Sequence, residues 1–351
     1  MQYVPQLLTC TMSPISDLGT YIFGLFASSP ATNNPVSAPA ALMDEPPRPR
    51  CRTDTDSSDT LTLPDGRKLG YVQYGSLTGR PIFYVHGLPG SRLQAAGFDE
   101  LGLKVGARVI SVDRPGIGLS SPLAGRTLLD HPKDIEHLAK HLKLDKYSVL
   151  VRRAYYSYER LNLFANTALL EREYQEVDLC GLGPPDIGMS GADWVHRLGF
   201  PYGLRYAPFS VVRWFWRYEG SARLDLTDEK RLELMLQKPV AHEKDNDFMK
   251  SGWPRVALQS SRESFKQGFE GVWQDGRLAC MNFGFRVEDI RPELPVQLWY
   301  GKLDTFVPPN HGVQIAARLG GRANLRLVDE THASIVVNRM EEILEELVKS
   351  T

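Results

Sequence analysis

Several apolar runs in this chain lack polar alternation, and this feature most constrains its fold. The runs PIFYVHG (81–87) and ARVISV, at the start of 107–118, are rich in β-branched and aromatic residues. Such runs are typical of strands buried on both faces, which occur in parallel sheets covered by helices. Helical stretches lie between the apolar runs, at 91–106 and 127–145. We therefore expect an α/β fold with a mostly parallel central sheet flanked by helices.

Composition and residue pattern change along the 351 residues of the chain. Residues 1–58 are rich in Pro, Ser, Thr, Asn and Asp without apolar periodicity, which predicts a disordered leader. Residues 59–185 and 286–351 carry the strand and helix pattern, so we expect them to form one core. Residues 186–285 are unusually aromatic and favour a helical insertion on the sheet. The last stretch predicts a closing helix with Met340, Ile343, Leu344 and Leu347 inward.

Composition excludes several classes of function. A net charge of −1 gives no basic field for nucleic acid and no polybasic signal for membranes. The eight histidines and four cysteines are dispersed, so we expect no metal site and no disulfide framework. We also expect no cofactor. The apolar run at 21–26 is too short for a membrane span. We expect a cytoplasmic protein whose partner is a small-molecule substrate or ligand.

Four loops that follow predicted strands could carry chemistry, because ligands of open α/β sheets bind beyond the carboxyl ends of the strands. HGLPGS (86–91) could bring a backbone N–H, best placed at Leu88, to a developing negative charge. In DRPGIGLSS (113–121), the first two residues more simply fix the loop. Asp304 follows a strand and His332 follows the last one. Taken singly, each of these residues is more often an ordinary turn or loop residue.

Together, these motifs resemble the α/β-hydrolase superfamily, in the branch with an HGxPG loop and a DRPGxGxS turn. The resemblance covers 59–151 and 181–351. It implies a mostly parallel sheet, a helical lid at 186–285 and a Ser…Asp…His triad. By position, Asp304 would orient the imidazole and His332 would be the general base. The loop formed by His86, Gly87 and Leu88 would supply the oxyanion site.

The family's nucleophile is missing from the expected turn. The resemblance implies a serine in Gly-x-Ser-x-Gly directly after the fifth strand, since glycines tolerate the strained backbone there. This pattern occurs nowhere in the sequence, and the expected position falls near Arg153, which is always protonated and cannot attack. The remaining serines are poorly placed. Ser157 comes one helical turn too late, Ser190 lies at the start of the insertion, and Ser120 follows the fourth strand.

The departure extends beyond one residue. Residues 154–176 have the pattern of a surface amphipathic helix, although the helix after this turn is normally buried. Glu176 and Asp178 then fall in the next strand, where burial without a partner would be costly. One hypothesis is an altered reading of the gene across 151–180. The other is a natural pseudoenzyme that kept the fold and lost the serine. An in-frame transcript across codons 148–182 that encodes this protein would contradict the first hypothesis.

Three functions remain to be compared. The first is a lidded serine hydrolase that acts on an ester, an amide or a related carbonyl substrate. The second is a pseudoenzyme that binds an apolar small molecule in the lid cleft without turnover, which the absent serine favours. A dinucleotide-dependent oxidoreductase is weaker, because no Gly-x-Gly-x-x-Gly follows a strand. An aminopeptidase would need a carboxylate in the insertion, for which Glu219, Glu263 and Glu270 are candidates.

Overall fold

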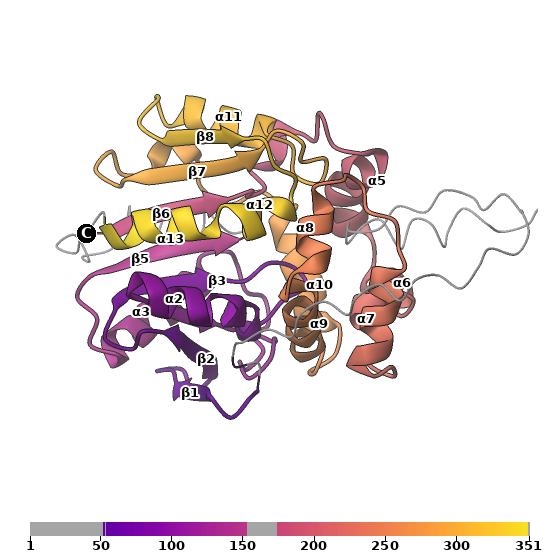
Figure 1. The fold of residues 1–351 in the computed structure, drawn as a ribbon, viewed down its shortest axis with the longest axis horizontal. Coiled ribbons are helices and arrows are strands. Elements are labelled where there is room, and N and C mark those ends of the chain that lie inside the picture. The colour runs from indigo at the N-terminus through magenta and orange to yellow at the C-terminus, as the bar shows by residue number, and fades with distance from the viewer. Residues whose placement is uncertain (1–51, 53, 153–173, 350–351) are drawn as a thin grey trace, which may run out of the picture.

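An eight-stranded sheet forms the centre of the molecule (Figure 1). The computed structural model describes residue 52, residues 54–152 and residues 174–349. The sheet order is β1-β2-β4-β3-β5-β6-β7-β8, and all pairings are parallel except those of β2 with β1 and β4. The strands are β1 Ser58–Thr62, β2 Lys68–Gly75, β3 Arg80–Val85, β4 Ala107–Val112, β5 Tyr147–Arg152, β6 Tyr174–Leu179, β7 Val296–Gly301 and β8 Asn324–Val328. The predicted mostly parallel sheet is confirmed.

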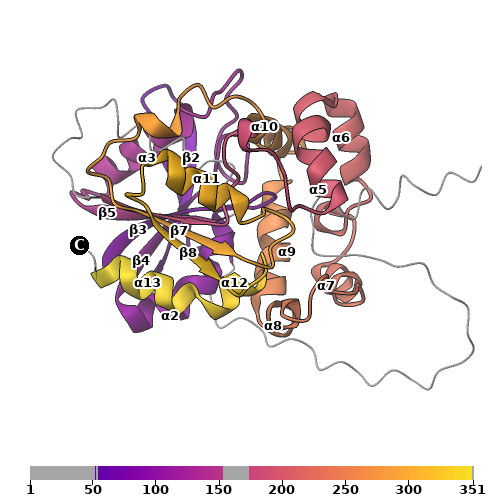
Figure 2. The ribbon, with the colours of Figure 1, turned by 90° about the horizontal axis from the view of Figure 1, so that it is seen from above.

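Helices cover both faces of this sheet (Figure 2). One face carries η1 (Arg92–Phe98), α2 (Asp99–Val105), α12 (Ser334–Asn338) and α13 (Met340–Lys349). The other face carries α3 (Asp130–His141) and α11 (Asn310–Arg318). This double cover explains the unbroken apolar runs, since all six residues of β7 are buried. The four apolar side chains predicted to face inward from α13 are all buried.

The segment between β6 and β7 is helical and lies beyond the carboxyl ends of the strands (Figure 1). Its helices are η2 Pro185–Ile187, α5 Trp194–Leu198, the π-helix η3 Gly199–Leu204, α6 Phe209–Trp216, η4 Gly220–Ala222, α7 Asp228–Leu236, α8 Asp245–Lys250, α9 Trp253–Ser264, α10 Glu270–Ala279 and η5 Val287–Asp289. We call residues 194–279 the insertion. Trp216 lies fully buried within it, whereas the side chains of Trp194 and Trp214 are exposed.

The region of the missing serine lies largely outside the described residues. That region includes Arg153, Ser157 and most of the predicted helix 154–176. The strand that follows, β6, forms despite its acidic residues. Asp178 is buried, but the hydroxyl of Tyr300 donates a hydrogen bond of 3.1 Å to its carboxylate. The expected cost of an unpaired buried charge is therefore offset at Asp178.

The predicted leader, residues 1–58, also falls mainly outside the described part. Its described end contacts the core, because Arg52 donates hydrogen bonds of 3.0 and 3.1 Å to the Asp99 carboxylate. The first strand begins at Ser58. Within the described residues, every helix is too short or too polar to cross a lipid bilayer.

Candidate active site

The structure brings Asp304 and His332 together at the carboxyl-end edge of the sheet. Asp304 follows β7 and His332 follows β8, two neighbouring parallel strands. His332 Nδ1 lies 2.5 Å from Asp304 Oδ2. Both side chains are buried. Two residues that are 28 positions apart in sequence thus form one hydrogen-bonded pair because their strands end side by side.

The loop after β7 fixes the Asp304 carboxylate. Its Oδ1 accepts hydrogen bonds from the backbone N–H groups of Phe306 and Val307, at 2.8 and 2.9 Å. With Oδ1 held by these two donors, Oδ2 faces His332 Nδ1, and we assign the proton of this hydrogen bond to Nδ1. The other ring nitrogen, Nε2, is then the one that can take up a proton. This is the tautomer that a general base in a hydrolytic triad requires.

A buried cysteine, which sequence reasoning missed, completes the surroundings of the pair. Cys180 directly follows β6, and a ligand atom of each of Cys180, Asp304 and His332 lies within 4.8 Å of the other two. Burial and the neighbouring Asp304 charge raise the pKa of the Cys180 thiol well above its usual value. The thiol therefore stays protonated, which disfavours it both as a nucleophile and as a metal ligand. The donor set fits a hydrogen-bonded pair better than a metal centre.

The ring of Phe306 links this pair to a second histidine–aspartate pair. Phe306 stacks on His332 with ring centroids 4.6 Å apart, and its ring centroid lies 4.1 Å from that of His196 in α5. His196 Nδ1 lies 2.5 Å from Asp193 Oδ2. The N–H of Asp193 also donates to the Thr305 carbonyl at 3.0 Å. The first helix of the insertion therefore packs directly against the loop that carries Asp304.

The predicted oxyanion loop lies at the end of β3, where His86, Gly87 and Leu88 are all buried. Gln94 Oε1 accepts the Gly87 N–H at 2.7 Å, so this N–H is already used. The role of the Leu88 N–H as the oxyanion donor of this loop stays a prediction. Burial, and then the charge of Arg114, lower the pKa of the His86 imidazole well below its usual value. His86 is therefore neutral and its ring is structural.

Buried ion pairs join the loop after β3 to the insertion. Arg114 donates to the carbonyls of His86 and Gly87 at 2.6 and 3.0 Å, and to Asp275 of α10 at 2.6 Å. Arg126 forms a second ion pair with Asp275. The predicted structural role of the DRPG turn is supported by these contacts. Sequence reasoning missed Asp275, because nothing local to α10 marks its partners in a distant loop.

Ser120 and Ser190 are the described serines among the candidate nucleophiles, and neither directly follows β5. Ser120 is buried, and its hydroxyl donates to the Asp113 carbonyl at 2.8 Å and accepts the Gly70 N–H at 2.9 Å. This serine is structural. Ser190 is exposed, and its loop precedes α5 rather than following β5. Among the aminopeptidase candidates, Glu263 is bound to Arg92 at 2.9 Å and Glu270 is exposed.

The remaining carboxylate of that set, Glu219, is buried in the insertion. Burial raises its pKa to about 7, although the charge of Lys238 acts in the opposite direction. Glu219 could therefore change its charge near neutral pH.

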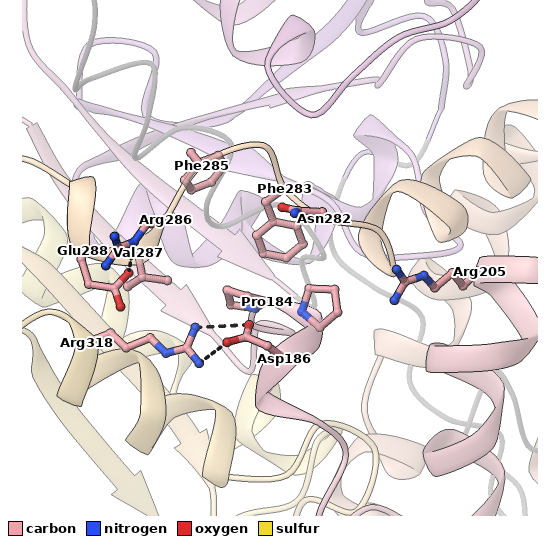
Figure 3. A pocket seen from close by; sticks show the side chains of 11 residues that line it. Pro184, Asp186, Arg205, Asn282, Phe283, Phe285, Arg286, Val287, Glu288 and Arg318 are labelled. Atoms are coloured by element: carbon pink, nitrogen blue, oxygen red, sulfur yellow. Dashed lines mark hydrogen bonds and ion pairs between the residues drawn. The ribbon is translucent and has the colours of Figure 1, made fainter.

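A cavity of about 100 Å³ borders His332, with Leu303, Phe306 and His242 among its lining residues. A larger pocket of about 600 Å³ lies elsewhere, between the loop after β6, the end of α11 and the segment before β7 (Figure 3). Arg205 and Arg318 extend toward it, and Arg318 pairs with Asp186. Its lining contains neither Asp304 nor His332, so its size does not make it the catalytic site.

Comparisons with known proteins agree with this architecture. No family model matches the chain. A Mycoplasma pneumoniae protein with the name "Putative proline iminopeptidase" is 32% identical over 100 residues, which are 28% of this chain and 32% of that protein. The matched segment thus spans about a third of the relative's length.

Solved structures match over a far larger part of the chain. An α/β hydrolase fold protein from Nakamurella multipartita has a TM-score of 0.55 at 20% identity and covers 83% of this chain and 99% of its own. An esterase from Exiguobacterium antarcticum has a TM-score of 0.53 at 17% identity and covers 83% of this chain and 98% of its own. A bromoperoxidase from Bacillus anthracis has a TM-score of 0.51 at 18% identity and covers 84% of this chain and 100% of its own. At these identities the likeness concerns architecture, and the names show that one architecture serves several chemistries. The chain has the α/β-hydrolase fold.

Proposed function

We propose that the chain descends from serine-type hydrolases of ester, amide or related carbonyl substrates, and that Asp304 and His332 are its acid–base pair. The observation that carries this proposal is the 2.5 Å hydrogen bond between His332 Nδ1 and Asp304 Oδ2 at the carboxyl-end edge of the sheet. Two backbone N–H groups hold the carboxylate in place. Such a pair has a protonated Nδ1 and a basic Nε2, which is the arrangement that activates a hydroxyl group.

The register of the strands supports the proposed reaction. Val85 of β3 lies in register with Val151 of β5, so a nucleophile presented after β5 would stand beside the oxyanion loop. His332 would take the proton of the attacking hydroxyl and return it to the leaving group as the carbonyl–heteroatom bond breaks. The Leu88 N–H would stabilise the negative oxygen of the tetrahedral intermediate. Water, activated by the same histidine, would then release the acyl group.

A second function is favoured by one specific observation. The sequence contains no Gly-x-Ser-x-Gly, and the buried Ser120 hydroxyl is already engaged in hydrogen bonds. A pseudoenzyme would bind a ligand beneath the insertion, acting as a lid, without turnover. The cavity beside His332, about 100 Å³, is small against the roughly 300–1,000 Å³ of typical ligand pockets.

The substrate class follows less directly from the site. The partial likeness to a protein named as a proline iminopeptidase makes prolyl amides worth testing beside simple esters. In the hydrolytic proposal, Glu219 and Glu270 are the candidate carboxylates that remain for a substrate amine, since Arg92 already binds Glu263. We therefore place esters first and prolyl amides second.

Hydrolysis of p-nitrophenyl acetate and of L-proline p-nitroanilide by the purified, folded chain tests the proposal. We expect ester turnover that falls by about 100-fold or more in His332→Ala, because general-base catalysis is worth about 10²–10⁴-fold. His196→Ala is the matched control, since it removes a buried imidazole bonded to an aspartate outside the proposed reaction. Absence of turnover with both substrates, or equal losses in both variants, would contradict catalysis by this pair.

A further inference from the structure

The insertion exposes an unusual number of large apolar side chains. Of those exposed in the described part of the chain, seven fall within residues 194–218 and six are scattered over the rest. The seven are between 46% and 68% exposed: Trp194, Leu198, Tyr202, Tyr206, Val211, Trp214 and Tyr218. Isolated exposed apolar residues are ordinary, but a group of them marks an interaction surface. We call residues 194–218 the aromatic face.

Helix α6 shows that this exposure follows a helical pattern. Val212 and Trp216 are buried against the rest of the insertion. Val211 and Trp214, three residues apart, lie on the exposed side of the helix, and Tyr218 follows four residues later. The rings of Trp214 and Tyr218 lie 5.6 Å apart between centroids, so they form a continuous apolar surface. This helix is therefore apolar on two sides, and only one of them is buried by the described part of the chain.

Charge identifies the partner that this surface fits. Residues 194–218 contain four arginines and no Asp or Glu, although the whole chain has a net charge of −1. The arginines are Arg197, Arg205, Arg213 and Arg217, and none forms an ion pair with another described residue. Exposed Trp and Tyr beside unpaired cations are the composition that binds the interface of an anionic bilayer. A protein partner of ordinary composition would not require this segregation of charge.

The position of the aromatic face suits docking at a surface. Figure 1 shows α6 on the side of the insertion that faces away from the sheet, and Figure 2 shows α5 beside α6. We propose that residues 194–218 dock the protein on the surface of an anionic phospholipid membrane, without crossing it. The aromatic side chains would enter the headgroup region and the arginines would contact lipid phosphates. The proposal holds whether or not the chain hydrolyses a substrate.

Cosedimentation with vesicles tests this docking surface. We expect the full chain to bind phosphatidylcholine vesicles that contain phosphatidylserine, to bind pure phosphatidylcholine vesicles weakly, and to dissociate as salt is raised. Each arginine near an anionic surface raises the partition coefficient by about fivefold. Loss of two arginines in Arg213→Gln/Arg217→Gln should therefore lower the partition coefficient by about 10-fold or more. Trp214→Ser/Tyr218→Ser should lower it by a similar factor.

Matched variants separate this surface from non-specific attraction. Lys133→Gln/Lys140→Gln on α3 changes the net charge equally, and Leu103→Ser on α2 removes an equally exposed apolar side chain. Both should bind vesicles like the original chain. Absence of binding to anionic vesicles, or equal losses in test and control variants, would overturn the proposal. A dimer in solution that dissociates in Trp214→Ser would assign the face to a second copy and would overturn it as well.

Discussion

Two buried histidines with aspartate partners both contact the Phe306 ring, and their local bonding is nearly the same. In each pair, Nδ1 of the imidazole lies 2.5 Å from a carboxylate oxygen. In each pair, the other carboxylate oxygen accepts two backbone N–H groups. Hydrogen bonding around the histidine therefore does not distinguish the His332 pair from the His196 pair.

What differs is the place of each pair in the fold. Asp304 follows a parallel strand and its side chain is fully buried, at the edge where α/β sheets bind ligands. Asp193 is the N-cap of the short helix α5, and its side chain is 26% exposed. The comparison teaches that a buried His–Asp pair is a common solution for capping or for packing, and that catalytic competence depends on what the second ring nitrogen faces.

Removing each carboxylate charge gives the largest expected contrast. Asp304→Asn should lower ester turnover by roughly 10³–10⁴-fold, because the amide favours the wrong imidazole tautomer. Asp193→Asn should change turnover by less than about 10-fold, since His196 has no proposed role in the reaction. Steady-state kinetics on the two variants measures both effects. Similar losses in the two variants would break the distinction between the pairs.

Phe306 is the contact that joins the two pairs. Phe306→Ala should lower the free energy of unfolding by about 3–5 kcal/mol, because it removes a buried aromatic ring between two imidazoles. Phe306→Leu keeps most of the volume and should cost about 1.5 kcal/mol or less. Urea unfolding measures both values. If the alanine variant cost no more than the leucine variant, Phe306 would not be the packed link described here.

The capping role of Asp193 predicts a smaller loss of stability. Asp193→Ala should cost about 1–2 kcal/mol, because two backbone N–H groups at the start of α5 lose their acceptor. Thr227→Ala is the matched control, since Thr227 caps α7 with a bond to the Lys230 N–H and should cost about 1 kcal/mol. An Asp193→Ala variant as stable as the original chain in urea would rule out the cap.

The smallest effect concerns pH. Burial raises the pKa of Asp193, but the hydrogen bond and charge of His196 and two backbone N–H groups outweigh burial and lower it below 3.8. A carboxyl with a lowered folded-state pKa stabilises the fold above its unfolded pKa, and this contribution is lost as pH falls through the folded value. The stability difference between the original chain and Asp193→Asn should therefore shrink between pH 5 and strongly acidic pH, as checked by urea midpoints. A difference that grows on acidification would contradict this sign.

The sequence predicted the sheet, the closing helix and the sites of Asp304 and His332, because each depends on local periodicity or on the order of loops along the chain. It did not predict Cys180, Phe306 or the His196 pair as neighbours of the site. The contacts of Cys180 with Asp304 and of His196 with Phe306 join segments that are more than a hundred residues apart, and no local pattern records such a distance. Asp178 is a further case. The sequence predicts that its burial without a partner is costly, but the hydroxyl of Tyr300, 122 positions away, donates a hydrogen bond to its carboxylate.

The central claim is that Asp304 and His332 form a working acid–base pair, and labelling with a fluorophosphonate probe tests it most directly. The folded chain and its His332→Ala variant would be treated side by side, and the modified peptide identified by mass spectrometry. We predict a covalent adduct on one serine that the His332→Ala variant does not form. An adduct that persists in that variant, or no adduct in the folded chain, would contradict the claim.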